Sequence, residues 1–264
     1  MSTSYSKEHK EYLKKIKKQK ILVIVTQIMI ISILFITWEI LSNKNIINTF
    51  FYSSPSNIIK TIINLFKTNS LFNHIYITIY EVFVSFLIAT IIGLITSTLL
   101  WWNKFLSKVM DPYLTILNSL PKVALGPLII IWAGASINSI IVMSLMISLI
   151  ITIINLYNSF NNTDENYITL MKTFKASKKD IFLKVILPAN KINIINALKI
   201  NMSMNFIGVI MGELLVSKEG LGYLIMYGSQ VFNINLVITS IVILGILSSL
   251  FYYLINYLEK KIIK

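Results

Sequence analysis

Long runs of apolar residues recur along this chain, separated by short polar segments. An α-helix needs about 20 consecutive apolar residues to cross the hydrocarbon core of a bilayer. Six runs reach or approach that length, and each predicts a membrane span. The predicted spans are residues 21–41, 75–100, 113–132, 137–157, 192–216 and 236–257. Pro121, Gly126 and Pro127 interrupt the third run, which predicts a broken helix there.

The composition indicates that the main solvent of these runs is lipid. Of the 264 residues, 55% are hydrophobic and 13% are charged, and the mean hydropathy is +0.73. Soluble domains carry about 25% charged residues, and a soluble chain of this length could not bury so much apolar surface. We therefore expect an all-α integral membrane protein with about six transmembrane helices in one domain, residues 21–258, after a basic segment at 1–20.

The distribution of lysines predicts the orientation of the spans. All 24 basic residues are lysines, and cytoplasmic segments of membrane proteins are enriched in them. With a cytoplasmic N-terminus, 18 lysines fall in inside segments and 4 in outside segments, while Lys122 and Lys199 lie within spans. We therefore expect a multi-pass protein of the cell membrane with both termini in the cytoplasm. The same bias explains the net charge of +13 without nucleic acid, and we expect the basic N-terminal segment to contact anionic lipid.

The segment between the fourth and fifth spans, about residues 161–188, is polar but patterned. Its first apolar residues follow the helical spacing i, i+3, i+4, i+7. These residues are Tyr167, Leu170, Met171 and Phe174. The face they form predicts a docking platform for another protein; the alternative is a face that lies on the membrane surface.

A second short helix is expected within the same segment. Ser177, with Asp180 three residues later, is typical of a capping box at a helix start. Pro188 is expected to end this helix. Its apolar stripe consists of Ile181, Phe182, Val185 and Ile186.

Two further patterns predict packing between helices. Pro55 is expected to open a helix that lies on the outer surface or against the other spans. Its apolar face consists of Ile58, Ile59, Ile62, Ile63 and Phe66. Gly208 and Gly212 form a small-xxx-small pair, which indicates close packing within one subunit or across a dimer. Asn201 and Asn205, on the same span, are expected either to hydrogen-bond between helices or to line a pore.

Some kinds of chemistry are absent from the sequence. There are no cysteines, and the two histidines, His9 and His74, have no ligand-spaced partners, so we expect neither a metal nor a cofactor. A phosphate-binding loop needs a Gly-Lys pair closing a glycine-rich turn, and none of the nine glycines is followed by lysine. We therefore expect a non-catalytic chain that cannot hydrolyse ATP by itself.

The 161–188 segment resembles the Glu-Ala-Ala loop of binding-protein-dependent ABC importer permeases. That pattern is Glu-Ala-Ala, three residues, Gly, nine residues and Ile-x-Leu-Pro. Thr169-Leu170-Met171, Lys175 and Val185-Ile186-Leu187-Pro188 match its spacing, and Ala176-Ser177 also fits. Thr169 stands in place of the Glu and Lys175 in place of the Gly. We expect the loss of this glycine to straighten the turn between the two short helices.

Two more segments are similar to the nitrate, sulfonate and taurine type of these permeases. Residues 119–128, followed by Trp132-Ala133-Gly134, resemble its third-span signature. Glu213, followed by the run of residues 219–225, resembles its signature after the fifth span. The resemblance covers about residues 55–258. Glu81 departs from the pattern, because sulfonate-type members usually have Arg there, whereas some relatives associated with thiamine precursors or riboflavin have an acid.

The resemblance implies the transmembrane permease subunit of an ATP-driven importer. It implies a homodimer, a separate ABC ATPase subunit and an extracellular binding protein that delivers a small solute. That solute would be a sulfonate, nitrate or taurine; the alternative is a thiamine precursor (a pyrimidine) or a riboflavin-like compound. The ATPase would dock on the 165–188 loop. The residues expected to contact it are Tyr167, Thr169, Leu170, Met171, Phe174, Lys175, Ala176 and Ser177.

Polar residues within the spans are candidates for the translocation pathway, because a charge at the centre of a membrane helix costs about 2.5–3.5 kcal/mol on insertion scales. The candidates are Asn118, Ser119, Lys122, Asn205 and Glu213. The first three border the break at Pro121, where freed backbone groups need a polar cavity or a neighbouring helix. Glu213 is expected either to line an outer gate or to tie the turn at Gly220 and Gly222 to the fifth span.

Three other classes fit less well. An energy-coupling-factor vitamin transporter component carries Ala-Arg-Gly motifs, which a chain without arginine cannot contain. A membrane-embedded enzyme needs clustered acids, histidines or a nucleophile, and the acids here are scattered. A secondary transporter often shows inverted repeats, and the sequence shows none. Neighbouring genes for an ATPase and a lipoprotein binding protein would decide the class.

Overall fold

Helices make up the regular structure of the chain. The computed structural model describes residues 7–262, and every regular element in that range is helical. The elements are α1 Lys7–Asn43, α2 Thr49–Tyr52, α3 Pro55–Lys67, α4 Ser70–Trp102, α5 Lys104–Ser119, η1 Lys122–Leu125, α6 Gly126–Ala133, α7 Ile137–Asn161, α8 Glu165–Thr173, α9 Lys178–Ile181, η2 Phe182–Ile186, α10 Leu187–Ala189, α11 Lys191–Val216, α12 Leu221–Gln230 and α13 Ile234–Ile262. Of these, η1 is a 3₁₀ turn and η2 a π-helical turn. The expected all-α fold is confirmed.

Five helices are long and apolar enough to cross a membrane, namely α1, α4, α7, α11 and α13. A sixth candidate consists of α5 followed by η1 and α6, which are bent by 84° at the break. The described chain therefore has five candidate spans, or the expected six if the bent pair crosses as one. The third run is not one helix but two, and the break lies at Pro121, as its ring and missing N–H require.

The core of the bundle is formed by α4, α7 and α11, which pack against one another along their lengths. Gly208 and Gly212 face α7 closely. A Cβ on Gly208 would lie 2.4 Å from the Cα of Ser144, and a Cβ on Gly212 would lie 2.9 Å from a methyl carbon of Ile140. The small-xxx-small pair therefore serves packing within one subunit.

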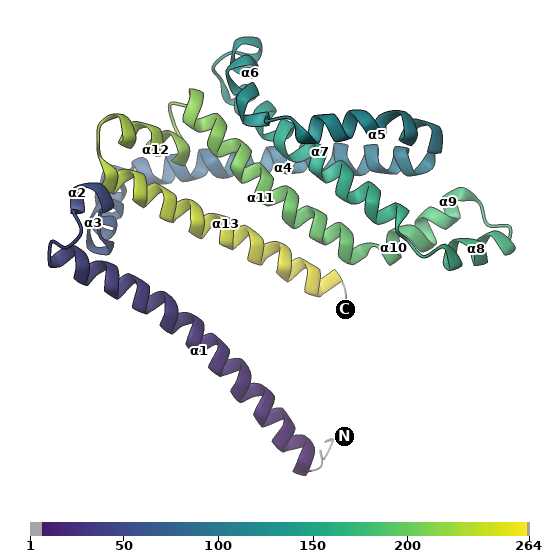
Figure 1. Cartoon of the computed structure of the whole chain (residues 1–264), viewed down its shortest axis with the longest axis horizontal. Helices are drawn as coiled ribbons and strands as arrows, with labels where there is room; N and C mark the ends of the chain where they lie inside the picture. The colour runs from purple at the N-terminus through teal and green to yellow at the C-terminus, as the bar shows by residue number, and fades with distance from the viewer. Residues whose placement is uncertain (1–6, 263–264) are drawn as a thin grey trace.

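The first helix stands away from this core (Figure 1). No part of the most apolar stretch of α1 is buried. Its contact with the rest of the chain is made through Glu39, whose carboxylate accepts hydrogen bonds from the backbone N–H of Ser56, at 3.0 Å, and from its hydroxyl. A negative charge is favourable there because Ser56 lies in the first turn of α3.

The helix α3 packs against α13 and α4. Ser54 caps its start by accepting the N–H of Asn57 at 3.2 Å. Ile58 is buried, and Ile62 packs onto a neighbouring core cluster together with Leu65. The expected five-residue face is therefore divided. The remaining members, Ile59, Ile63 and Phe66, are exposed.

The two ends of the bundle carry different structures (Figure 1). α2, α3 and α12 lie at one end, and α8 to α10 lie at the other. Both ends of the described chain lie toward the end that carries α8 to α10. This arrangement separates the two regions in which the sequence predicts functional residues.

Candidate functional site

The loop between α7 and α11 is shaped by local backbone hydrogen bonds. Asp164 caps α8 by accepting the N–H of Asn166 at 2.9 Å. At the other end of α8, the N–H of Lys175 bonds to the carbonyl of Lys172 at 2.9 Å, and the N–H of Ala176 bonds to that of Met171 at 3.0 Å. This pair of bonds is a Schellman motif, which ends the helix with a sharp turn.

Lys175 occupies the left-handed position of that motif, with a φ of 55°. The expectation that lysine in place of glycine straightens the turn is therefore wrong. A residue with a Cβ costs about 1–2 kcal/mol in this conformation, and the two Schellman hydrogen bonds, made by the backbone alone, offset that strain. The bend depends on backbone hydrogen bonding more than on the identity of the residue.

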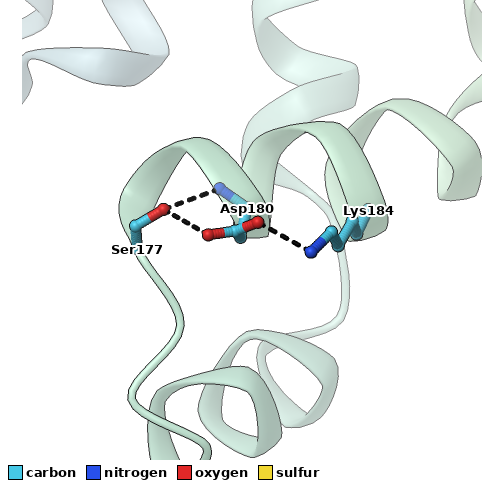
Figure 2. Close-up of polar contacts among 3 residues, drawn as sticks. All are labelled: Ser177, Asp180 and Lys184. Atoms are coloured by element: carbon cyan, nitrogen blue, oxygen red, sulfur yellow. Dashed lines mark hydrogen bonds and ion pairs between the residues drawn. The ribbon is translucent and has the colours of Figure 1, made fainter.

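The second short helix begins where the sequence predicts. Ser177 accepts the N–H of Asp180 at 3.1 Å, and its hydroxyl donates to the Asp180 carboxylate (Figure 2). The other carboxylate oxygen of Asp180 lies 2.7 Å from Nζ of Lys184, one turn further along. The hydrogen bond from Lys184, and then that from Ser177, lower the pKa of Asp180.

The helical run that begins with α9 ends at Ala189, one residue beyond the expected end at Pro188. α9 runs on through η2 and α10, and Pro188 lies in the first turn of α10. The N–H of Leu187 bonds to the carbonyl of Phe182, five residues back, so the turn before the proline is wide. Proline is tolerated there because first-turn residues have no N–H partner within the helix.

The inner face of α8 anchors the loop to the bundle. Ile168, Met171 and Ala176 pack against a cluster of buried residues. The cluster consists of Leu156, Phe160, Ile181, Phe182, Ile186 and Ala197. Phe182 lies at its centre, with ring centroids 5.0 Å from Trp101 and 5.5 Å from Phe160. Aromatic packing of this kind holds the loop rigidly on the ends of α4 and α7.

The outer face of α8 presents exposed apolar side chains. Tyr167, Leu170 and Phe174 are 57%, 54% and 74% exposed. Thr169, Lys175 and Ser177 are also exposed, whereas the other two predicted docking residues, Met171 and Ala176, are half-buried against the bundle. The predicted set is thus divided into an outward face and an anchor.

Two tethers of the loop were not predicted. Lys178 donates to the backbone carbonyl of Trp102, and its Nζ lies 5.7 Å from the ring centroid of Trp101. Asn190 donates to the hydroxyl of Thr163 at 2.7 Å, which joins the end of the loop to its start. No sequence signal marks these residues, because their partners lie far away along the chain.

A cavity of about 570 Å³ opens between α8 and the adjoining ends of α4 and α7. Its lining includes Lys104, Lys172 and Lys178 together with Glu165. Apolar groups from Leu100, Trp101 and Ile168 complete it. The exposed apolar face of α8 therefore lies next to this cavity.

The structure brings together two of the predicted pathway residues at the helix break. Nζ of Lys122 donates to the backbone carbonyl of Asn118 at 3.3 Å and to its side chain at 3.5 Å. Ser119 donates to the carbonyl of Ile116 instead, at 2.9 Å. Lys122 therefore satisfies a carbonyl that the bend leaves without a helical partner.

Asn205 lies inside the interface between α7 and α11. Its side-chain oxygen accepts from the hydroxyls of Ser144 and Ser148, at 2.7 and 3.2 Å. Its amide donates to the backbone and the side chain of Asn201. Of the two expectations for this residue, the structure has interhelical hydrogen bonds, and they use its full donor and acceptor capacity.

Glu213 ties the turn after α11 to α4. Its carboxylate accepts the hydroxyl of Thr78 at 2.6 Å and the N–H of Gly222. The hydroxyl of Thr78 in turn accepts the N–H of Leu221 at 2.9 Å. A Cβ on Gly220, where φ is +102°, would lie 2.3 Å from a Glu213 oxygen, so this glycine is required for the turn. Of the two roles expected for Glu213, these contacts are those of the tie.

Lys199, the other lysine within a predicted span, forms an ion pair. Its Nζ lies 2.5 Å from the carboxylate of Glu259 on α13 and 3.2 Å from the side-chain oxygen of Asn256. The pair joins α11 to α13, which explains a charge at this depth. Among the described residues, no group of three or more His, Asp or Glu is placed to hold a metal ion.

A sequence profile decides the family. The profile for binding-protein-dependent transport system inner membrane components matches residues 89–264. The chain belongs to this family. It is therefore an ABC importer permease, as the loop spacing and the two signatures indicated.

Curated relatives agree over most of the permease. An ABC transporter permease protein of Haemophilus influenzae is 29% identical over 89% of this chain and 96% of its own length. The aliphatic sulfonates transport permease protein SsuC of Bacillus subtilis is 26% identical over 88% of this chain and 84% of its own. The formylaminopyrimidine transport permease protein ThiX of Halalkalibacterium halodurans is 27% identical over 72% of this chain and 75% of its own. The resemblance to the nitrate, sulfonate and taurine type is thereby confirmed.

A solved structure shows the same fold. The inward-facing MetNI methionine ABC transporter superposes on this chain with a TM-score of 0.61. The match covers 72% of this chain and 92% of that chain, at 22% identity. At this level of identity the similarity establishes the arrangement of helices.

Proposed function

We propose that this permease couples a separate ATPase to solute passage through the outer face of α8. The observation that supports the proposal is the contrast within the loop: Met171 and Ala176 anchor it, while Leu170 and Phe174 remain exposed. An exposed apolar face on a rigid support is what a partner groove needs, because little order has to be gained on binding. The adjoining recess then accepts a side chain of the ATPase.

The proposed orientation places both termini and α8 to α10 in the cytoplasm. The lysine distribution supports it, and both ends of the described chain lie toward the α8–α10 end of the bundle (Figure 1). α12 and the turn held by Glu213 then lie on the outer side. There an extracellular binding protein delivers the solute.

The working assembly is a homodimer of the permease with two ATPase subunits. ATP binding closes the ATPases and draws the two α8 helices together. Phe182 and the tryptophans of α4 hold each loop rigidly against the bundle. Movement of the loop is therefore transmitted directly to the ends of α4 and α7. The spans then alternate between inward-open and outward-open states.

The solute is a small molecule of one of two classes. The sulfonate class, with nitrate and taurine, is supported by the SsuC relative. The pyrimidine class is supported by the ThiX relative and by the acid at Glu81. A binding screen of the partner binding protein with both classes distinguishes them.

A paired substitution tests the docking surface. Leu170→Asp with Phe174→Asp should abolish co-purification of the ATPase and solute-stimulated ATP hydrolysis. Loss of a buried anchor typically costs 2 kcal/mol or more of binding free energy, so we expect association to weaken by about 30-fold or more. Because both positions are exposed, the melting temperature of the permease should hardly change.

Ile46→Asp is the matched control. Ile46 is 65% exposed and lies between α1 and α2, at the other end of the molecule. This variant should retain the ATPase. Unchanged co-purification and transport in the paired variant would exclude the outer face of α8 as the docking site.

A further inference from the structure

A second cavity lies at the opposite end of the bundle from α8. It has a volume of about 520 Å³ and is bordered by α4, the start of α7 and the segment that follows α11. Its lining includes Glu81, Ser136, Ile140, Val216 and Lys218. In the proposed orientation this cavity lies in the outer half of the spans, where a solute enters.

Glu81 is the unusual member of this lining. It is completely buried, and neither of its carboxylate oxygens has a hydrogen-bond partner among the described residues. Glu213, which is also buried, has both Thr78 and the N–H of Gly222 as donors. A buried carboxylate without a partner is costly, because desolvation is not repaid by hydrogen bonds. Thr78 and Gly222 therefore account for Glu213, whereas among the described residues the group beside the Glu81 carboxyl is the second acid, with which it can share a proton.

The cost is increased by the second carboxylate. Glu81 and Glu213 lie near enough to interact electrostatically. One carboxyl can donate its proton to the other, but two ionised carboxylates side by side in an apolar region would repel each other. A positive group placed in the cavity would relieve this repulsion, whereas an anion would add to it.

The basic side chains of the spans do not supply that positive group. Lys122 bonds to Asn118, and Lys199 pairs with Glu259. Lys218 borders the same cavity, but it is exposed and forms no ion pair among the described residues. The ring of His74 accepts the N–H of Gly220 through Nδ1. Among the described residues, no basic side chain therefore neutralises the Glu81 carboxylate, and a cationic ligand in the cavity would do so.

We propose that this cavity is a solute subsite in which Glu81 accepts N–H bonds from a cationic or amidine-like nitrogen group, such as the edge of an aminopyrimidine. A carboxylate matches two adjacent N–H donors in a planar group and makes short, charge-assisted bonds with them. The apolar walls from Ile140 and Val216 suit a flat ring. The proposal rests on the proposed transport function and selects the nitrogen-rich solute class over sulfonates and nitrate.

Two probes of one shape and opposite charge test it. Benzamidine and benzenesulfonate share a phenyl ring, and only the first carries an amidinium group. The full-length permease, purified with its ATPase, is heated with each probe at 10 mM. Benzamidine should raise the melting temperature by about 2–4 °C, the shift expected for a millimolar ligand, and benzenesulfonate should not.

Substitutions assign the shift to one carboxylate. Glu81→Gln should abolish the benzamidine shift measured against its own probe-free melting temperature, and Glu81→Asp should retain a smaller shift. Glu39→Gln, which alters a carboxylate bound to Ser56 far from the cavity, should leave it unchanged. In proteoliposomes, Glu81→Gln should lower uptake of a 4-aminopyrimidine solute by 10-fold or more, with ATPase co-purification intact.

Three results would overturn the proposal. They are a wild-type protein that benzamidine does not stabilise, a shift that persists in Glu81→Gln, and stabilisation by benzenesulfonate. The second result would mean that Glu81 holds only a proton, because glutamine imitates the protonated acid. Failure of the coupling role is seen separately, as ATPase that still co-purifies with the Leu170→Asp, Phe174→Asp variant, because benzamidine binding needs no ATPase.

Discussion

The two functional ends of the permease are built in opposite ways. At the α8–α10 end, local hydrogen bonds at Asp164, Lys175 and Ser177 set the shape of the loop, and apolar side chains face outward. At the other end, a buried carboxylate, Glu213, sets the shape of the turn through bonds to residues far away in the sequence. The first design leaves apolar side chains exposed, and the second buries a carboxylate between helices.

This difference explains which residues each end tolerates. The two hydrogen bonds that end α8 are made by the backbone, so lysine can replace glycine at position 175. The turn at Gly220 has no such freedom, because any Cβ there would overlap the Glu213 carboxylate. Substitutions at the two ends should therefore change the stability of the permease by different amounts.

The largest effect is expected at Phe182, where the loop meets the bundle. Phe182 is 6% exposed and contacts three other aromatic rings. Phe182→Ala should lower the free energy of unfolding by about 3–5 kcal/mol, measured by thermal or denaturant unfolding in detergent. Phe174→Ala, at a 74% exposed position of the same loop, should leave stability nearly unchanged but weaken ATPase binding. Similar destabilisation by both would show that the loop has no distinct outward face.

Removing the buried carboxylate at the other end is expected to have the next largest effect. Glu213→Ala leaves the hydroxyl of Thr78 and the N–H of Gly222 without an acceptor. Since each unpaired buried group costs about 1–3 kcal/mol, the free energy of unfolding should fall by about 2–5 kcal/mol. Glu219→Ala, at an exposed position of the same turn, is the control. A small effect of Glu213→Ala would mean that the turn does not depend on this carboxylate.

A smaller effect is expected at the cap of α9. Ser177→Ala removes the acceptor of the Asp180 N–H and should cost about 0.5–2 kcal/mol. Amide hydrogen exchange of residues 178–181 should then speed up, while exchange in α12 stays the same. Ser177→Asn, which retains a capping oxygen, should restore slow exchange. If alanine changed nothing, packing alone would hold this helix.

At Lys175, in contrast to the positions above, a substitution is expected to increase the stability of the permease. Lys175→Gly should stabilise the permease by up to about 1 kcal/mol, because glycine adopts the left-handed conformation without strain from a Cβ. Lys175→Val should destabilise it, since branching at Cβ increases the strain. Comparison of the three melting temperatures checks this order. A less stable glycine variant would show that the lysine side chain itself supports the loop.

The smallest effect is expected in the pH dependence of the stability of α9. The pKa of Asp180 is lowered by Lys184 and Ser177, so its contribution to stability is present above the unfolded pKa, near 4. That contribution is lost as the pH falls through the lower, folded value. Hydrogen exchange of α9 should therefore accelerate slightly more below pH 4 in the wild type than in Asp180→Asn. Equal acid responses would mean that the contacts in Figure 2 do not stabilise the helix.

Local patterns predicted a good part of the docking loop. The helical spacing of Tyr167, Leu170 and Phe174 identified its outward face, and Ser177 with Asp180 marked the start of α9. These signals succeed because their causes lie within one or two helical turns. Met171 was assigned to the same face but packs inward, since the direction of burial depends on Phe182 and its neighbours.

The apolar runs determined the helical membrane fold from the sequence alone, and the loop spacing with the two signatures indicated the family, because hydrophobic length and motif spacing are local properties. Only the tertiary structure decided that Glu213 is bound by Thr78, while in the part of the chain that the structure describes Glu81 has the second acid beside it and no basic partner. These two acids look alike in the sequence. Their partners come from other helices, 135 residues away for Thr78, and the fate of a buried charge depends on which donors the folded chain brings beside it.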